Sequence, residues 1–238
     1  MRHNSLPMPE ITKFQILTNY FPNNFPLDVL LGNMKPKSWQ EKRAKFYFEK
    51  ILELDSVLRK IGRYPLYFLE FYPTSEAISK SEAVEYHWYS YMQDIYILKE
   101  RIMGIIGSLK NDLSRYNLAN PNDANRLLDH LKNNVMSGLK EATKFRDKHT
   151  HERTARNFDI TRANALSLIK KNAQELSLDI KKLDGKIEEL TEKSKIEYAD
   201  MAYRNNGEME KLKDFFAPRF GHLFASINGH DHSVFKID

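Results

Sequence analysis

Apolar residues recur at steps of three and four along most of the chain, which is the spacing of one face of an α-helix. The most regular run lies in residues 80–115 and consists of Val84, Trp88, Tyr91, Ile95, Leu98, Ile102, Ile105 and Leu109. At 1.5 Å per residue, a helix over this range is about 50 Å long. The pattern predicts one long amphipathic helix here.

Two capping sequences mark helix starts. Ser38-Trp39-Gln40-Glu41 and Ser79-Lys80-Ser81-Glu82 both place Glu three residues after Ser, the spacing of a capping box. The second begins the long helix just described. The first predicts a helix that ends at Gly62 and Pro65, followed by a short aromatic helix over 65–72.

Two further helices are predicted downstream. One follows the break at 120–123, carries Leu127, Leu131 and Val135, and is extended toward Phe145. The other is long, begins near Thr161, is interrupted by the polar tract 205–207 and stops at Pro218. Its apolar face consists of Ile169, Ala173, Leu176, Ile180, Leu183, Ile187 and Leu190.

The predicted fold class is all-α, an antiparallel bundle of four to five helices with long helices and an irregular N-terminal segment. Residues 1–37 form that segment, because prolines recur at 7, 9, 22, 26 and 36. Residues 38–217 form the helical domain, and residues 218–238 form a C-terminal tail. The long apolar stripes either form the core of one chain or, in a homodimer, face a second copy as well as the core. We expect a homodimer.

Composition removes several classes of chemistry. The chain has 238 residues and no cysteine, which excludes disulfides, thiolate zinc sites, iron–sulfur clusters and cysteine nucleophiles. No apolar run approaches the ~18 residues of a membrane-spanning helix. No signal-like apolar core follows the N-terminus. We therefore expect a cytoplasmic protein with no membrane partner and no cofactor.

The segment from 140 to 171 concentrates positive charge. It holds nine Lys or Arg against four Asp or Glu, a local excess equal to the net charge of +5 of the whole chain. His149 and His151 lie inside it. Basic groups beside titratable imidazoles suit a phosphate-rich partner such as RNA. The alternative is a solvated helix end whose Lys and His side chains complement the helix dipole.

Arg146-Asp147-Lys148-His149-Thr150-His151 resembles the signature of the HEPN superfamily, in which His follows Arg after four to six residues and a polar residue commonly follows the Arg. The resemblance implies a small helical bundle that dimerises. It also implies a metal-independent endoribonuclease of toxin–antitoxin or abortive-infection defence, although other members only bind. An antitoxin or another defence-system protein is the partner this implies.

The chemistry of RNA cleavage explains these residue types. The 2′-hydroxyl nucleophile needs a base and the leaving 5′-oxygen needs an acid, and an imidazole can serve at neutral pH. A guanidinium stabilises charge on the phosphoryl oxygens. We assign Arg146 to binding the phosphate and His151 to proton transfer. Asp147 is assigned to holding either the Arg146 side chain or the imidazole in place. The residues expected to bind flanking phosphates are Lys144, Lys148, His149, Arg153 and Arg156.

Helix geometry constrains this site. Five residues of a continuous helix leave Arg146 and His151 about 140° apart, so one straight helix cannot present both to one phosphate. Either the helix ends near Lys148, or two copies combine their motifs. The resemblance implies the second arrangement, at a symmetric dimer interface.

Other candidate sites are weaker. His149 and His151 lack a third metal ligand at helical spacing, so no metal site is predicted. His230-Asp231-His232 is interpreted as a flexible end. The aromatic residues Tyr86, Trp88, Tyr89, Tyr91 and Tyr96 include candidates for base stacking. Among them Trp88 and Tyr91 lie on the apolar face and are assigned to the core, and Tyr89 and Tyr96 are freer to face a ligand.

Three functions remain open on these grounds. The first is an endoribonuclease acting as a homodimer. The second is a catalytically silent module of the same fold that binds a nucleotide or a protein. The third is a helical scaffold in which residues 161–216 form a coiled-coil arm.

Overall fold

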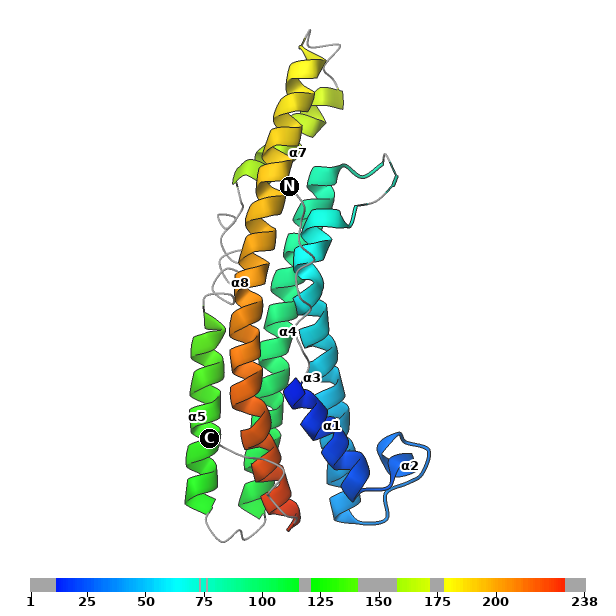
Figure 1. The fold of residues 1–238 in the computed structure, drawn as a ribbon, viewed down its shortest axis with the longest axis vertical. Helices are drawn as coiled ribbons and strands as arrows, with labels where there is room; N and C mark the ends of the chain where they lie inside the picture. The colour runs from blue at the N-terminus through cyan, green and yellow to red at the C-terminus, as the bar shows by residue number, and fades with distance from the viewer. Residues whose placement is uncertain are drawn as a thin grey trace. The chain divides into compact units, whose positions relative to one another are not determined.

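The computed structural model describes residues 12–72, 74–75, 77–115, 121–140, 158–171 and 178–229. Within these ranges all regular structure is α-helical and no strand occurs (Figure 1). The helices are α1 (Thr12–Asn24), α2 (Leu27–Leu30), α3 (Trp39–Glu70), α4 (Lys80–Arg115), α5 (Pro121–Gly138), α7 (Phe158–Lys171) and α8 (Ile180–Asn228). The predicted all-α class is confirmed. None of these described helices is long and apolar enough to span a membrane.

Both predicted capping boxes start helices. At α3, the Ser38 Oγ accepts the Glu41 N–H at 3.1 Å, and Glu41 Oε2 accepts the Lys37 N–H at 2.5 Å. At α4, the Ser79 Oγ accepts the Glu82 N–H at 3.2 Å, and Glu82 Oε2 accepts the Ser79 N–H at 2.7 Å. These bonds supply partners to backbone donors that a first helical turn leaves open. Helix α4 begins and ends where the sequence predicts.

The N-terminal segment is more regular than predicted. It contains α1 and α2, although Pro22 lies inside α1. Helix α1 forms because Phe14, Leu17 and Phe21 lie on one face and are buried. The density of prolines obscured this short periodicity.

The prediction that Gly62 and Pro65 end a helix is wrong, because α3 continues through both. Tyr64 and Phe68, on either side of the proline, are fully buried. Asn206 of α8 donates from Nδ2 to the Gly62 carbonyl at 3.2 Å. A proline inside a helix costs about 3 kcal/mol, and the burial of this aromatic face offsets that cost.

The predicted helix is present as α5, but it begins at Pro121, inside the predicted break at 120–123, with the proline at its first position. Its buried face consists of Leu128, Leu131 and Val135, rather than one that includes Leu127. The predicted extension of this helix toward Phe145 lies outside the described residues.

The single long helix predicted downstream is instead two helices, α7 and α8. Lys193 Nζ pairs with Asp159 Oδ2 at 2.6 Å, and Lys170 Nζ pairs with Asp184 Oδ1 at 2.6 Å. These two pairs require α7 and α8 to run antiparallel. The reversal escaped the sequence analysis because both helices carry apolar faces of the same period, and periodicity does not report direction.

The polar tract 205–207 does not interrupt the helix, and α8 passes through it. The Asn205 Nδ2 donates to the Tyr91 hydroxyl at 2.8 Å, and the Asn206 amide is the donor to α3 described above. The polar side chains of this tract are therefore used to fasten α8 to α3 and α4, rather than to solvate a loop.

Helix α8 also continues through Pro218, where the sequence predicts a stop and a loose tail. Phe220 and Phe224 are fully buried, and their rings stack with centroids 6.2 Å apart. The Arg219 Nη1 donates to the Phe215 carbonyl at 2.9 Å. Aromatic burial and this side-chain donor sustain the helix past the proline.

The chain divides into two compact units. Unit 1 consists of Met1–Arg59, Ile97–Lys140 and Gly207–Asp238, and unit 2 consists of Lys60–Tyr96 and Glu141–Asn206. Each has its own aromatic core: that of unit 1 includes Phe21, Tyr47, Phe220 and Phe224, and that of unit 2 includes Tyr64, Phe68, Trp88, Tyr91 and Tyr198.

Not all neighbouring helices are antiparallel. In unit 2, Trp88 stacks on Tyr198 with centroids 4.4 Å apart, and Tyr91 contacts Asn205. Residue numbers therefore rise together along α4 and α8, so these two helices run in the same direction. Two helices that run in the same direction need an antiparallel segment between them in the chain, and α7 runs antiparallel to α8.

Candidate functional site

The ribonuclease site predicted from the sequence lies in residues 141–157, which are outside the described residues. This holds for the proposed catalytic residues Arg146, Asp147 and His151. It holds as well for the phosphate-binding candidates Lys144, Lys148, His149, Arg153 and Arg156. The segment follows α5 and precedes α7. Its assignment stays a prediction.

The described part of the chain holds no group of three or more His, Asp or Glu side chains placed to bind a metal ion. The His230-Asp231-His232 sequence lies beyond residue 229 and so outside the described residues.

A cluster of aromatic rings surrounds His87 in unit 2. The imidazole centroid lies 6.0–6.5 Å from the centroids of five rings. We call these residues the aromatic cluster: Tyr67, Phe68, Phe71, Tyr72, Tyr86 and His87.

Local helix geometry assembles this cluster. Phe71 directly follows the last residue of α3, and its N–H still donates to the Tyr67 carbonyl at 3.4 Å. The side chains of Tyr67 and Phe71 therefore lie on one face, with ring centroids 5.8 Å apart. His87 comes from the third turn of α4, and its Nε2 lies 2.8 Å from the Phe71 carbonyl oxygen. A carbonyl can only accept, so Nε2 carries the proton of this hydrogen bond. The imidazole thereby fixes the end of α3 against α4.

Two rings of the cluster face solvent. Phe71 is 66% exposed and Tyr86 is 68% exposed, and both contact the half-buried His87. Large side chains of this type contribute strongly to binding when a partner covers them. The exposed part of the cluster is thus a preformed apolar surface.

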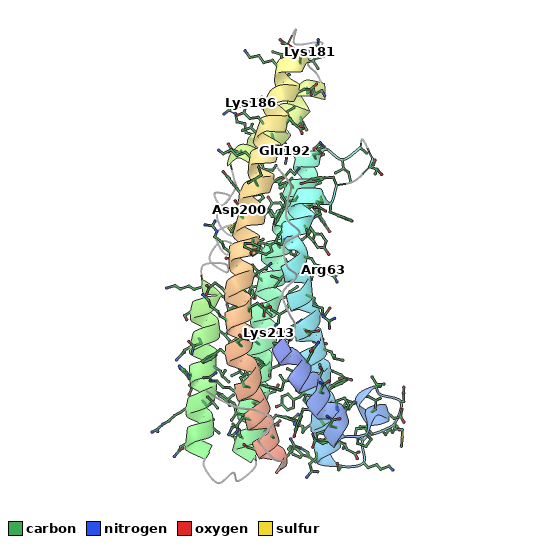
Figure 2. The ribbon with its side chains drawn as sticks, in the orientation of Figure 1. Arg63, Lys181, Lys186, Glu192, Asp200 and Lys213 are labelled. Atoms are coloured by element: carbon green, nitrogen blue, oxygen red, sulfur yellow. The ribbon has the colours of Figure 1, made fainter. Side chains whose placement is uncertain are left out.

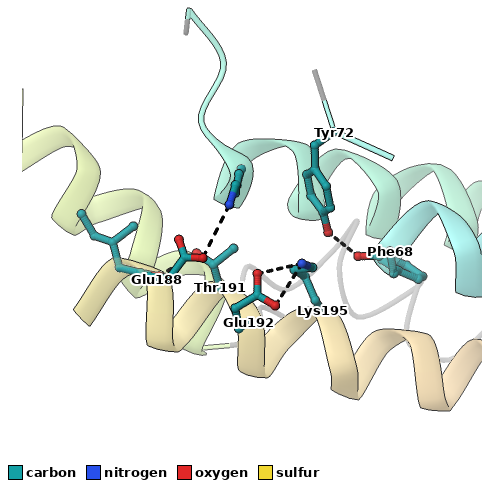
Figure 3. A network of polar contacts seen from close by, with 8 residues as sticks. Phe68, Tyr72, Glu188, Thr191, Glu192 and Lys195 are labelled. Atoms are coloured by element: carbon teal, nitrogen blue, oxygen red, sulfur yellow. Dashed lines mark hydrogen bonds and ion pairs between the residues drawn. The ribbon is translucent and has the colours of Figure 1, made fainter. Parts of the chain in front are cut away.

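The inner side of the cluster is held by a polar network (Figure 3). The Tyr72 hydroxyl donates to the Phe68 carbonyl. The Lys195 ammonium lies 4.8 Å from the centre of the Tyr72 ring and donates to Glu192 Oε1 at 2.7 Å. Burial, and secondarily the negative charge of Glu192, raise the pKa of Tyr72. The phenol therefore stays a neutral donor at physiological pH.

Negative charge borders the exposed rings. Glu70 is the last residue of α3 and is exposed, where the helix dipole already places partial negative charge. Glu85, which precedes Tyr86, is half-buried and accepts from the Asn164 amide at 2.7 Å and the Tyr89 hydroxyl at 3.0 Å, so its carboxylate is turned toward α7 rather than toward the exposed rings. The exposed cation nearest along α3 is Arg63, one turn before Tyr67 (Figure 2).

The aromatic residues named from the sequence divide as follows. Trp88 and Tyr91 are buried, which confirms their assignment to the core. Tyr89 and Tyr96 are half-buried, and the Tyr89 hydroxyl is bound to Glu85. Tyr86, not Tyr89 or Tyr96, is the most exposed of the five.

Two buried carboxylates of α4 form a second kind of polar site. Each carboxylate accepts a hydrogen bond from a tyrosine hydroxyl of α3. Each also forms an ion pair with a cation four residues before that tyrosine. We call them the Asp112 triad, which consists of Arg43, Tyr47 and Asp112 in unit 1, and the Asp94 triad, which consists of Lys60, Tyr64 and Asp94 in unit 2. The hydroxyl–carboxylate distances are 2.8 Å and 2.6 Å, and Lys60 Nζ lies 2.9 Å from Asp94.

Burial raises the pKa of Tyr47, against a smaller lowering by the Arg43 charge. At Tyr64 burial is again the largest cause, and the hydrogen bond to Asp94 and the charge of Asp94 add to the rise in pKa. Each buried carboxylate is satisfied by a hydroxyl and a cation of the same chain, so we expect both triads to contribute to stability.

Sequence analysis missed the aromatic cluster and both triads. Signals for them were present: five aromatic residues lie between 64 and 72, and Asp94 and Asp112 each follow a residue of the apolar run, Tyr91 and Leu109, by three positions. Neither signal identifies a partner, because the hydrogen bonds that join α3 to α4 here link residues 16, 30 and 65 positions apart.

No family model, no curated protein and no solved structure matches this chain.

Proposed function

We propose that the chain is a metal-independent endoribonuclease of the HEPN type, acting as a cytoplasmic homodimer in a bacterial toxin or phage-defence setting. The observation that carries this proposal is the sequence Arg146-Asp147-Lys148-His149-Thr150-His151 within a segment rich in Lys and Arg. The all-helical architecture is the one that the resemblance implies.

In the proposed mechanism, His151 takes the proton of the ribose 2′-hydroxyl or gives one to the leaving 5′-oxygen. The 2′-oxygen forms a bond to phosphorus as the bond to the 5′-oxygen breaks. Arg146 stabilises the charge on the phosphoryl oxygens, and Asp147 orients Arg146 or the imidazole. The products are a 2′,3′-cyclic phosphate and a 5′-hydroxyl.

The test compares RNA cleavage by the purified wild type with cleavage by Arg146→Ala and His151→Ala. Arg204→Ala is the matched control, because Arg204 is an exposed cation on α8. We expect both motif variants to lose cleavage with unchanged melting temperature, and the control to retain it. EDTA should not inhibit. A substrate with one 2′-deoxy sugar immediately 5′ of the cut should resist cleavage.

Cleavage of the deoxy-substituted bond would contradict the mechanism. Full activity in both motif variants would contradict the site.

A second function, a protein-binding module, is favoured by one observation, the exposed rings of Phe71 and Tyr86. Exposed apolar surface of this kind marks interaction sites. It predicts that the protein has a macromolecular partner whether or not it cleaves RNA.

A further inference from the structure

We propose that the aromatic cluster is a docking surface for a cationic segment of a partner protein, whose Arg or Lys side chains lie over the rings of Phe71 and Tyr86. The proposal is independent of ribonuclease activity. It rests on three properties of the cluster: exposure, rigidity and sign of charge.

The exposed rings are held in place before any partner binds. The Phe71 backbone is bonded at both ends, since its carbonyl accepts from His87 and its N–H donates to the Tyr67 carbonyl at 3.4 Å. The rings of both Phe71 and Tyr86 contact the imidazole. Binding therefore costs little side-chain ordering, which favours affinity.

The sign of charge selects the partner. Ring faces carry partial negative charge and attract cations. The exposed carboxylate of Glu70 and the C-terminal end of α3 add to this negative charge. A phosphate backbone would be repelled here, so the surface favours a cationic peptide over nucleic acid.

The cluster already holds one cation in the proposed manner. Lys195 places its ammonium 4.8 Å from the centre of the Tyr72 ring, on the inner side. The same ammonium donates a hydrogen bond to the Glu192 carboxylate. A ring paired with a carboxylate is thus a cation-binding arrangement that this corner of unit 2 uses internally. On the outer side, the exposed Phe71 directly follows the exposed Glu70.

The experiment measures binding of a fluorescent oligo-arginine peptide to the full chain by anisotropy, with an oligo-glutamate peptide and oligouridine as competing probes. We expect Phe71→Ala/Tyr86→Ala to weaken binding of the oligo-arginine peptide about tenfold, because each exposed ring contributes about two- to fivefold. Glu70→Gln should weaken it less. Arg63→Gln should leave it unchanged or strengthen it, because Arg63 opposes a cation.

Two variants keep the result interpretable. Phe71→Leu/Tyr86→Leu retains apolar side chains without the rings and should weaken binding as the alanine pair does. Tyr203→Ala removes an exposed ring of α8 outside the cluster and should change nothing. Circular dichroism should show wild-type helix content in all of them.

Wild-type affinity in the leucine pair, or an equal loss in Tyr203→Ala, would overturn the proposal. Binding of oligouridine that is lost in the alanine pair and weakened by Arg63→Gln would replace it with a nucleic-acid surface. Neither result would bear on the ribonuclease proposal, which rests on Arg146 and His151.

Discussion

The Asp112 triad of unit 1 and the Asp94 triad of unit 2 share one geometry but differ in their contact with water. Arg43 is 23% exposed in its side chain, whereas Lys60 is 52% exposed. The Nε of Arg43 is buried without a hydrogen-bond partner. The Asp112 triad therefore holds the more enclosed ion pair, and the Asp94 triad holds one whose cation opens to solvent.

This difference matters because the cost of losing one partner of an ion pair depends on whether water can hydrate the charge that remains. An enclosed charge that loses its partner cannot regain hydration, which costs about 3–5 kcal/mol. A charge at the surface is solvated again, and pairs of that kind contribute about 0–1 kcal/mol. The same three residue types thus predict unequal effects in the two units.

The largest expected effect is that of Asp112→Ala. It leaves the Arg43 guanidinium and the Tyr47 hydroxyl without their carboxylate, and we expect a loss of about 3–5 kcal/mol in the free energy of unfolding. For a chain of this size that lowers the melting temperature by roughly 6–20 °C. Asp94→Ala should cost about 1–3 kcal/mol, mainly through the unpaired Tyr64 hydroxyl.

Thermal unfolding followed by circular dichroism measures both variants. Asp112→Asn and Asp94→Asn, which keep an acceptor for the tyrosine, are the matched controls. Equal losses in the two alanine variants would show that solvent access does not distinguish the triads.

The next effect concerns alkaline pH, where the triads should behave alike. Burial raises the pKa of Tyr47 and of Tyr64, and that of Tyr91 to about 12. Tyrosines of the unfolded chain titrate near pH ~10. The folded protein therefore holds the phenol protons of these tyrosines to a higher pH than the unfolded chain does. Their contribution to the free energy of unfolding is complete below pH ~10 and is lost as the pH rises toward the pKa of the folded state.

Tyr47→Phe and Tyr64→Phe should each lose about 1 kcal/mol at pH 9, because one hydrogen bond is removed. Above pH ~10 each variant should lose stability less steeply than the wild type, by up to about 1.4 kcal/mol per pH unit. Denaturant unfolding at a series of pH values measures this slope. Tyr86→Phe, at an exposed tyrosine, is the control and should leave the pH slope of the free energy of unfolding unchanged. A smaller slope in only one of the two triad variants would show that the triads do not behave alike.

The smallest expected effect is that of Lys60→Met. Because Lys60 is half exposed, water should replace it at Asp94, and the loss should be about 1 kcal/mol or less and should shrink with added salt. Arg43→Met should cost several times more and should depend little on salt. A Lys60→Met loss as large as that of Arg43→Met would place the Asp94 pair among enclosed ion pairs.

The proposed catalytic site illustrates what a sequence can specify without a structure. Residue type and spacing are enough to propose Arg146 and His151, because the chemistry needs a guanidinium and an imidazole together. They do not determine whether one protomer or two bring those groups to the same phosphate, because that distance depends on how the chain folds around them.

The sequence by itself determined what depends on near neighbours in the chain. The helical class follows from the three-and-four periodicity, and the starts of α3 and α4 follow from Ser38 and Ser79, because capping is completed within four residues.

Only the tertiary structure decided where helices outlast their breaking signals and where the chain reverses. Pro65 and Pro218 remain inside helices because distant aromatic residues bury the adjacent faces. The aromatic cluster exists because α3 and α4 meet around His87. The cost of a proline is local, whereas the burial that offsets it comes from residues far along the chain, so no short window of sequence contains both.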